Sequence, residues 1–529
     1  MSCIYFDIKL YDPAFYQANI LSEAGITVFI LCLNLFWFYG YYHLFFTLYS
    51  YFLVKVPRYS LPPLLKNPRV ALFYTTKDDF QEKALESCLK QTYDNFVVFI
   101  LDDSIDEGIK ARIEAFVSTY SQVRLLRRER QQGFKAGNLN NALRQIGNEY
   151  EYFAVSDADS IFPEDFLEKL LPYFLLDEKI AFVQANQKAN PRQASEFARI
   201  FAFNTDLHWN HYVPVKEQYG FMMFYGHGAI VRTKAWEEVG GFPEVASEDL
   251  AFSSLLREKN YQGIFAREVY CYEEFPSTYK RMRKRNNRWS KGAAEYLEKY
   301  FPSFFKNKNV SWVEKIDVFI SAGSLLLALP FLAYIIVAAI VLPYSQHIFN
   351  LNIPVHLVYP VNPANFLDFV AHIQYKVYWT FDFFLIMLIT SSAQLWPVVI
   401  DLIKKPAYML RYLVVFTYVC LATVLISSLD FIEYIATKKA QFLVTGEITH
   451  QDSYARENKI IFLEVLFGIY MLYLTYTTAN VWTLIIGLSL ILNPLVIKYD
   501  LESRALNKLL YLPFFLNIML LVLISRSLE

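Results

Sequence analysis

A long uncharged run near the N-terminus constrains the fold more than any other feature of the chain. Residues Ala24–Val54 include no aspartate, glutamate, lysine or arginine. A helix crosses a bilayer with about 20 apolar residues, so this run is long enough to span one even when tilted. We expect one span here, with room for a second short pass. Hydrophobic residues make up 55% of the 529 residues and aromatic residues 18%, which is typical of a membrane protein rather than a soluble enzyme.

Charge and cysteine content limit the partners, the metal sites and the topology that we expect for the chain. Residues Met1–Asn19 lack the basic start and cleavage site of a signal peptide, so the first apolar segment is expected to be retained. The net charge of −1 argues against a nucleic-acid partner. The five cysteines show no paired or metal-type spacing, which argues against a disulfide framework and a zinc site. Basic residues follow the span and, by the positive-inside rule, place the next region in the cytosol: Lys55, Arg58, Lys66 and Arg69.

Residues 60–310 have a different character, because short apolar runs alternate there with amphipathic stretches. Helical patterns lie at Phe80–Gln91 and Glu107–Tyr120, for example. Strands that alternate with helices predict an α/β domain with a mostly parallel, Rossmann-like sheet, and ligands of such sheets bind at the carboxyl ends of the strands. Five strands are expected, at Val70–Tyr74, Phe96–Leu101, Val123–Leu126, Tyr152–Val155 and Ile180–Gln184.

Residues 311–529 are again mostly apolar and are expected to form a membrane region. The basic groups around Lys404 and Lys498 mark cytosolic turns. A polar interruption at 436–458 follows the third expected span and would lie outside if that span crossed. Either this span re-enters without crossing, which we favour, or the number of spans before it differs. Six spans are expected, at Asp317–Leu342, Val377–Ile400, Tyr412–Leu429, Ile460–Thr478, Trp482–Ile497 and Leu509–Ile524.

Acidic residues follow two of the expected strands directly. The second strand leads into Asp102 and Asp103, and the fourth leads into Asp157 and Asp159. Two carboxylates one residue apart suit Mg²⁺ or Mn²⁺, which prefer hard oxygen ligands and also bind diphosphates. Turn formation or helix capping explains either cluster equally well alone. The presence of both at strand ends of one sheet favours a nucleotide-diphosphate site.

Two loops add residues suited to binding. Lys135 follows Gly133 and opens a helix, where an ammonium group and a helix N-terminus together attract a diphosphate; a solvated lysine is the alternative. Gly226 and Gly228 flank His227 and permit a close backbone approach to a ligand. His227 itself is not expected to bind metal, because no second His or Cys lies at ligand spacing.

The sequence Ser247-Glu248-Asp249 opens a further helix. An acid at this place can take a proton from an attacking hydroxyl. Capping by Ser247, with the acids as favourable first-turn charges, explains the same sequence, and both roles are compatible.

The run Arg285-Asn286-Asn287-Arg288-Trp289 joins cations to an indole. Arginine binds phosphate oxygens through a planar fork, and tryptophan offers a flat apolar face to a sugar ring. Such residues also gather at membrane interfaces, and taken alone the run fits an interface anchor better.

Taken in this order, these motifs resemble those of the membrane-embedded family 2 glycosyltransferases, which include cellulose, hyaluronan and other β-glucan synthases. The resemblance covers about Val70–Trp289. It implies a GT-A fold in a cytosolic domain between transmembrane segments, an inverting mechanism, a UDP-sugar donor, and Mg²⁺ or Mn²⁺. By position it assigns donor binding to Asp102, Asp103, Lys135 and Arg288, the metal to Asp157 and Asp159, the general base to Asp249, and acceptor binding to Trp289, Glu248 and Gly226.

Two positions depart from the family pattern. Arg285 stands where the QxxRW motif begins with glutamine, and its extra charge can meet either the diphosphate or a lipid headgroup. The run Phe442-Leu443-Val444-Thr445-Gly446-Glu447 resembles an FxVTxK gating loop, with glutamate in place of lysine. Phe442, Val444 and Thr445 are therefore assigned to a candidate gating loop, for which a chance match is the alternative.

The resemblance implies a processive synthase in the plasma or inner membrane. It would polymerise a UDP-sugar into a β-linked polysaccharide and move the polymer through its own membrane region. UDP-glucose is the expected donor, with UDP-N-acetylglucosamine next. Two alternatives remain: transfer of a single sugar to a lipid acceptor, and a nucleotide-sensing transporter without catalysis.

Overall fold

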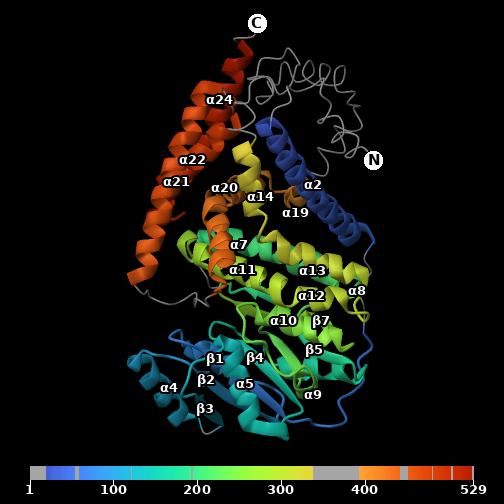
Figure 1. The fold of residues 1–529 in the computed structure, drawn as a ribbon. Helices are drawn as coiled ribbons and strands as arrows, with labels where there is room; N and C mark the ends of the chain where they lie inside the picture. Colours follow the sequence, from blue (N-terminus) through green and yellow to red (C-terminus); the bar gives the residue numbers. More distant parts are fainter. Residues whose placement is uncertain are drawn as a thin grey trace. The chain divides into compact units, whose positions relative to one another are not determined.

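The computed structural model describes residues 20–53, 59–120, 122–191, 195–337, 392–440, 451–478, 481–501 and 504–526. The chain divides into two compact units (Figure 1). One, which we call the sheet unit, comprises Tyr49–Leu326 and Asp430–Ile448. The other, the helical unit, comprises Met1–Leu48, Leu327–Leu429 and Thr449–Glu529.

A seven-stranded, mostly parallel sheet organises the sheet unit, as predicted. The strand order is β3-β2-β1-β4-β6-β5-β7, and only β6 runs antiparallel to its neighbours among the described strands. All five expected strands are present, whereas β6 and β7 were not predicted. The strands are β1 Val70–Thr76, β2 Phe96–Asp102, β3 Val123–Arg127, β4 Tyr152–Asp157, β5 Ile180–Ala189, β6 Ala229–Arg232 and β7 Gln262–Glu273.

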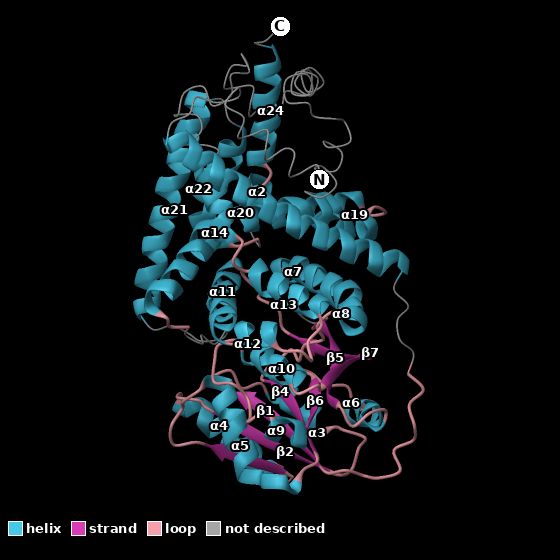
Figure 2. Cartoon of the chain, turned by 45° about the vertical axis from the view of Figure 1, so that its right-hand side comes forward, coloured by secondary structure: helices cyan, strands magenta, loops and turns pink. Residues whose placement is uncertain are grey.

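Helices cover both faces of this sheet (Figure 2). One hydrophobic cluster joins the sheet to α3 Glu82–Leu89, α4 Glu107–Thr119 and α6 Phe166–Leu170. A second cluster joins its other face to α5 Phe134–Ile146, α9 Thr233–Glu238 and α10 Glu248–Glu258. The remaining helices of the unit are α7 Glu196–Leu207, α8 Val213–Tyr219, α11 Tyr279–Lys299, α12 Phe301–Lys306 and α13 Trp312–Ser324.

Strand β1 shows why these residues form a central strand. Leu72 and Tyr74 enter the first cluster, whereas Ala71 and Phe73 enter the second. Successive side chains of a strand point to opposite faces, so a strand covered on both sides must be apolar at nearly every position. Burial of each large side chain contributes about 1.5–3 kcal/mol, which fixes this strand in the middle of the core.

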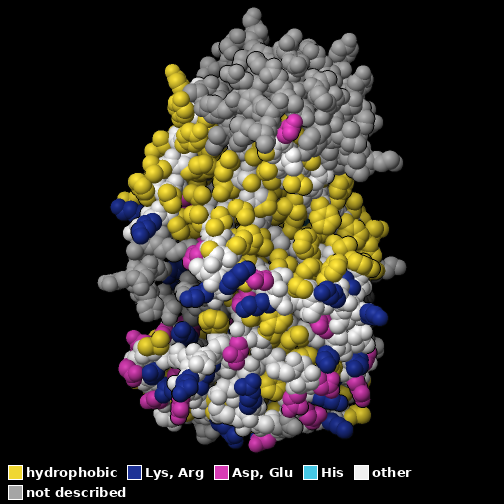
Figure 3. All heavy atoms as spheres, viewed as in Figure 1, with side chains coloured by type: hydrophobic (Ala, Val, Ile, Leu, Met, Phe, Trp, Pro, Cys, Tyr) yellow, Lys and Arg dark blue, Asp and Glu magenta, His cyan; other side chains and the backbone are white. Residues whose placement is uncertain are grey.

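The helical unit contains α2 Ile20–Leu48, α14 Ala328–Ile336, α19 Trp396–Leu402, α21 Gln451–Thr478, α22 Val481–Tyr499, α23 Arg504–Leu509 and α24 Leu512–Arg526, together with most of α20 Pro406–Thr437. By length and composition, three helices among the described residues are able to cross a membrane: Glu23–Leu53, Pro406–Thr437 and Asn458–Tyr476. The helical unit presents mainly hydrophobic side chains in Figure 3, whereas lysine, arginine, aspartate and glutamate are frequent on the sheet unit.

The predicted span at Asp317–Leu342 is not one straight helix. Helix α13 ends at Ser324, and the axis turns by 62° before α14. Asp317 is buried in the sheet unit, where it forms an ion pair with Lys216 and accepts from the Phe221 N–H over 2.8 Å. Helices α13 and α14 together are apolar and long enough for one bent span or a re-entrant loop; α13 belongs to the sheet unit and α14 to the helical unit.

Two other predictions concern residues that the structure describes only in part. Most of the expected span Val377–Ile400 and the candidate gating-loop residues Phe442, Val444 and Thr445 lie outside the described residues. Helix α20 extends beyond the predicted Tyr412–Leu429 in both directions.

Candidate active site

Strand pairing places the two predicted acidic clusters at one edge of the sheet. Strands β2 and β4 both run parallel to β1, with Asp102 opposite Thr76 and Asp157 opposite Thr75. The carboxyl ends of these strands therefore lie together, where ligands bind in doubly wound sheets. Thr75 also donates from Oγ1 to Asp157 Oδ1 over 3.1 Å.

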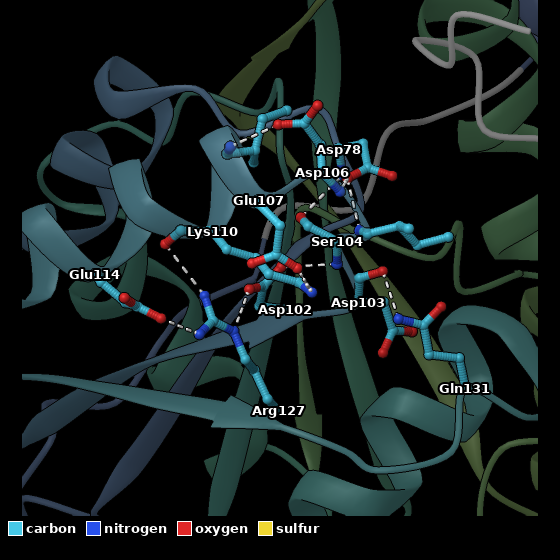
Figure 4. Close-up of polar contacts among 12 residues, drawn as sticks. Asp78, Asp102, Asp103, Ser104, Asp106, Glu107, Lys110, Glu114, Arg127 and Gln131 are labelled. Atoms are coloured by element: carbon cyan, nitrogen blue, oxygen red, sulfur yellow. Dashed lines mark hydrogen bonds and ion pairs between the residues drawn. The ribbon is translucent and has the colours of Figure 1, made fainter.

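An arginine holds each acid of the first cluster. Arg127 donates from Nε to Asp102 Oδ2 over 2.6 Å, and Arg128 donates to both oxygens of Asp103 over 2.8 and 2.6 Å. Gln131 donates to the Asp103 carbonyl over 2.8 Å (Figure 4). The charge-assisted bonds of Arg127 and Arg128 connect the end of β3 to the end of β2. Both acids therefore have structural partners, and their contact with a nucleotide stays a prediction.

Lys135 lies in the first turn of α5 and connects two elements of the site. Its Nζ donates to the Gly226 carbonyl over 2.9 Å and to a carboxylate oxygen of Asp157. Burial lowers the pKa of Lys135, but the charges of Asp157, Glu248 and Asp249 outweigh it and raise the pKa above its ordinary value. Lys135 therefore stays charged among three acids, and it is the centre of the site.

Two glycines make this arrangement possible. Gly133 caps α5 with φ +70°, and a Cβ there would lie 2.4 Å from the carboxylate of Glu244. Gly226 has φ +86°, and its Cβ position lies 3.8 Å from both Asp249 Oδ2 and Lys135 Nζ. Positive φ favours glycine at both places, and a Cβ at Gly226 would be in ordinary van der Waals contact with both the lysine and the acid.

The second acidic cluster concentrates negative charge beside Lys135. Burial opposes ionisation of Asp157, but Lys135 and His227 lower its pKa to about 2. Burial and the charges of Asp157 and Glu273 raise the pKa of Asp159 to about 7. Burial acts against charged His227, yet Asp157 and Glu273 raise its pKa to about 9, with Nε2 3.4 Å from Glu273 Oε2. An added cation would relieve the repulsion between these acids.

The acids fit a metal ion that arrives with a diphosphate. Within the part of the chain that the structure describes, no three His, Cys, Asp or Glu residues are grouped as a metal site. Mg²⁺ commonly uses one or two protein carboxylates and completes its coordination with phosphate oxygens and water. Asp157 and Asp159 offer such hard ligands, and burial, followed by the charges of Asp157 and Glu273, raises the pKa of Asp159.

Helix α10 opens with the predicted general base. Ser247 occupies the N-cap position, but its side chain makes no capping hydrogen bond. Asp249 Oδ1 accepts from the next backbone N–H over 2.7 Å. Burial raises the pKa of Asp249, against the charges of Lys135 and Arg288, and burial together with Asp249 raises the pKa of Glu248 to about 7. A raised pKa makes a carboxylate a better proton acceptor.

The Arg285–Trp289 run lies within α11 of the sheet unit. The charge of Arg288 acts on Glu248 and Asp249, which places it at the base side of the site. The Trp289 side chain is 36% exposed. The Arg285 guanidinium carbon lies 3.9 Å from the centroid of the Trp289 ring, so one face of this indole is covered by a cation. Stacking of a sugar on Trp289 stays a prediction.

Several residues of the site were not predicted from the sequence. Thr75 and Arg128 could have been found, because each stands at or just after a strand end. Glu273 closes β7, and no strand was expected there. Phe201 lies 4.8 Å from Arg285 across more than eighty residues of sequence, and no local signal indicates that contact.

Comparisons with known proteins point to one class of enzyme, the glycosyltransferases. The sequence model of the family described as "Glycosyl transferase family group 2" matches residues 152–429, more than half of the chain. "Glucomannan 4-beta-mannosyltransferase 9" of Arabidopsis thaliana is 31% identical over 237 residues, which cover 43% of this chain and 44% of the relative. The match thus spans less than half of that relative's length.

Solved structures show weaker likeness. The mannosyltransferase PcManGT from Pyrobaculum calidifontis, in complex with GDP-Man and Mn²⁺, is 20% identical with a TM-score of 0.44, and the match covers 71% of this chain and 99% of that one. GalNAc-T7 with UDP, GalNAc and Mn²⁺ is 9% identical with a TM-score of 0.34, and the match covers 49% of this chain and 54% of that one. TM-scores this low do not establish a shared fold.

Proposed function

The chain belongs to glycosyl transferase family group 2, and from this premise we propose that it is an inverting hexosyltransferase with a GT-A fold. The observation that supports this most is the position of Lys135. Its ammonium group contacts Asp157 and Gly226 and is influenced by Asp249. Lys135 Nζ and Asp249 Oδ2 each lie 3.8 Å from the Cβ position of Gly226, and a cation close to a proton acceptor is what displacement of a nucleoside diphosphate by a hydroxyl requires.

The proposed reaction uses the chain's own residues in distinct roles. Asp249 takes the proton of the acceptor hydroxyl while that oxygen attacks the anomeric carbon. The bond from this carbon to the diphosphate breaks, and the diphosphate leaves with the bonding electrons. Lys135 and Arg288 stabilise the negative charge that develops on the leaving group. Attack from the face opposite the leaving group converts an α-linked donor into a β-linked product.

A divalent cation would be held by Asp157 and Asp159. When bound, Mg²⁺ or Mn²⁺ supplies positive charge for the leaving diphosphate. Glu273 and His227 flank these acids from β7 and from the Gly226 loop. His227 offsets part of the negative charge of the pair and Glu273 adds to it, and neither is assigned as a ligand.

The acceptor is proposed to be a growing polysaccharide, with Trp289 under its terminal sugar and Glu248 and Gly226 beside it. Trp289 is partly exposed, and aromatic rings bind the apolar faces of sugars. We propose that the long apolar helices anchor the chain in the cell membrane with the sheet unit in the cytosol, and that the polymer crosses through the helical unit. A synthase that exports its product needs several spans.

UDP-glucose is the proposed donor, as the motif resemblance implies. A mannosyl donor is the second candidate, because the relative that shares 31% identity is named for mannosyl transfer into glucomannan. Both candidates are α-linked nucleotide hexoses and make the same demands on Lys135, Asp157 and Asp249.

A donor panel tests this proposal. The full chain, purified in lipid nanodiscs, is incubated with radiolabelled UDP-glucose, UDP-N-acetylglucosamine and GDP-mannose in the presence of Mg²⁺ or Mn²⁺, and the products are sized. A ladder of long products from one donor supports the polymerase. Products limited to one sugar on lipid would instead support the single-transfer alternative, and absence of transfer from every donor with intact nucleotide binding would support a sensor.

A further inference from the structure

One buried side chain binds most of the loop that carries Gly226. Gln184 lies in β5, is fully buried, and accepts from the Tyr225 N–H through Oε1 over 3.0 Å. Its Nε2 group donates to the carbonyls of His227 and Gly228 over 2.9 and 3.1 Å. The amide of Gln184 thus binds the backbone on both sides of Gly226 and holds this residue at the turn of the loop.

The core around Gln184 does not by itself explain an amide at this position. The neighbours in the strand, Phe182, Val183 and Ala185, are apolar and buried. A buried amide loses its hydrogen bonds with water, and the protein must replace them. Among the described residues, Gln184 forms one side-chain hydrogen bond with the adjacent Ala185 carbonyl, and its others go to the loop at 224–228. The amide is therefore matched to this loop.

A serine connects the same loop to the helix of the proposed base. Ser253 lies on α10 and is 2% exposed. Its hydroxyl accepts from the Phe224 N–H over 2.9 Å and donates to the Asp249 carbonyl over 2.6 Å. Donation to the carbonyl four residues back is common for serine in a helix, whereas the bond from Phe224 joins residues 29 apart in the sequence. Ser253 thus ties the start of the loop to the first turn of α10.

The Gly226 carbonyl is the part of the loop that meets the proposed site. It accepts from Lys135 Nζ over 2.9 Å. Gly226 has φ +86°, a conformation that glycine adopts without strain. Its Cβ position lies 3.8 Å from both Lys135 Nζ and Asp249 Oδ2. A shift of this loop would therefore move the lysine relative to the acid.

We propose that Gln184 and Ser253 are positioning residues of the transfer reaction, which fix the Gly226 carbonyl, and with it the Lys135 ammonium group, beside Asp249. The inference rests on the proposed function. Both residues act through the backbone of the loop rather than on a substrate. A displacement of about 1 Å at reacting groups reduces a rate by about 10²-fold even when its cause lies elsewhere. Loss of either residue should therefore lower kcat.

A purely structural role makes a different prediction. Removal of any buried, hydrogen-bonded polar group destabilises the fold. Two nearby residues have the same chemistry as Gln184 and Ser253 but form no hydrogen bond with the loop at 224–228. Asn186 on β5 donates to the Arg267 carbonyl over 3.2 Å, and the Ser254 hydroxyl on α10 lies 2.7 Å from that of Tyr296. Variants of Asn186 and Ser254 therefore measure the effect of a lost buried bond alone.

The test compares Gln184→Glu with Asn186→Asp, and Ser253→Ala with Ser254→Ala, in the full chain in nanodiscs. Each acidic variant keeps the size of the amide and replaces its NH₂ donor by an oxygen. The kcat is measured with the nucleotide hexose that wild type prefers, and nucleoside diphosphate binding is measured by calorimetry with Mn²⁺. Thermal unfolding of each variant is recorded alongside.

Relative to their controls, Gln184→Glu should lower kcat about 10²-fold and Ser253→Ala about 10-fold. Diphosphate affinity should stay within about 3-fold of wild type, because Lys135 keeps its contact with Asp157. Equal kcat within either pair overturns the inference for that residue, as does a loss of diphosphate affinity as large as the loss of kcat. If Gln184→Glu does not fold, the serine pair decides alone. If wild type transfers no hexose from any nucleotide donor, the proposed function fails instead.

Discussion

Replacement of Lys135 by methionine tests the electrostatic centre of the site. The change keeps the length of the apolar stem and removes the ammonium group, which contacts Asp157 and the Gly226 carbonyl. The pKa of Asp157 is about 2 instead of 3.8, and each unit corresponds to about 1.4 kcal/mol. His227 and Thr75 also contribute to this shift, and the Asp157 side chain is 35% exposed, so solvent screening leaves at most about 1–2 kcal/mol of lost stabilisation in the free enzyme.

The effect on the ligand should be larger than the effect on stability. A charge-assisted hydrogen bond to a diphosphate contributes about 1.5–3 kcal/mol, so Lys135→Met should weaken nucleoside diphosphate binding about 10- to 150-fold. Calorimetric titration with Mn²⁺ measures this directly. Lys169→Met is the control, because Lys169 forms a surface pair with Asp165 at 52% side-chain exposure and should change neither quantity. Unchanged diphosphate affinity in a folded Lys135→Met protein would refute the assignment.

Three further outcomes are expected. Asp249→Asn should reduce kcat about 10²- to 10⁴-fold and leave nucleotide affinity nearly unchanged, whereas Glu248→Gln should weaken acceptor binding and lower kcat far less; equal losses of kcat would contradict the choice of base. In wild type, kcat/KM should fall as the pH drops through the raised pKa of Asp249. Glu248→Gln should shift that fall to lower pH, because a neighbouring negative charge is lost. A pH–rate profile measures both. Lys216→Met and Asp317→Asn should each lower the free energy of unfolding by about 3–5 kcal/mol, and the double variant by less than their sum; additive losses in chemical denaturation would show that the pair does not interact.

The parallel part of the sheet was predictable because its strands are covered on both faces. Val70–Tyr74 and its neighbours read as continuous apolar runs, and the positions of the acids at strand ends followed from them. Strand β6 has only four residues, too few for a periodic signal. Strand β7 pairs with β5 through register shifts, and Arg267 and Glu268 interrupt its apolar pattern.

The site was predictable at the level of motifs but not of partners. The motif order singled out Lys135, Asp157 and Asp249, which the fold then brought into electrostatic contact. The arginine partners of Asp102 and Asp103 depend on the pairing of β2 with β3, which no single motif describes. Local periodicity also explains why the 62° bend after Ser324 was not predicted, because the apolar pattern continues through it.

The anomeric configuration of the first bond formed tests the central claim most directly. The full chain in nanodiscs is supplied with its preferred α-linked nucleotide hexose. The anomeric configuration of the new bond in the product is then measured by nuclear magnetic resonance. Single displacement aided by Asp249 predicts a β-linked hexose polymer, with one nucleoside diphosphate released for each sugar added. An α-linked product would contradict the mechanism proposed for this site.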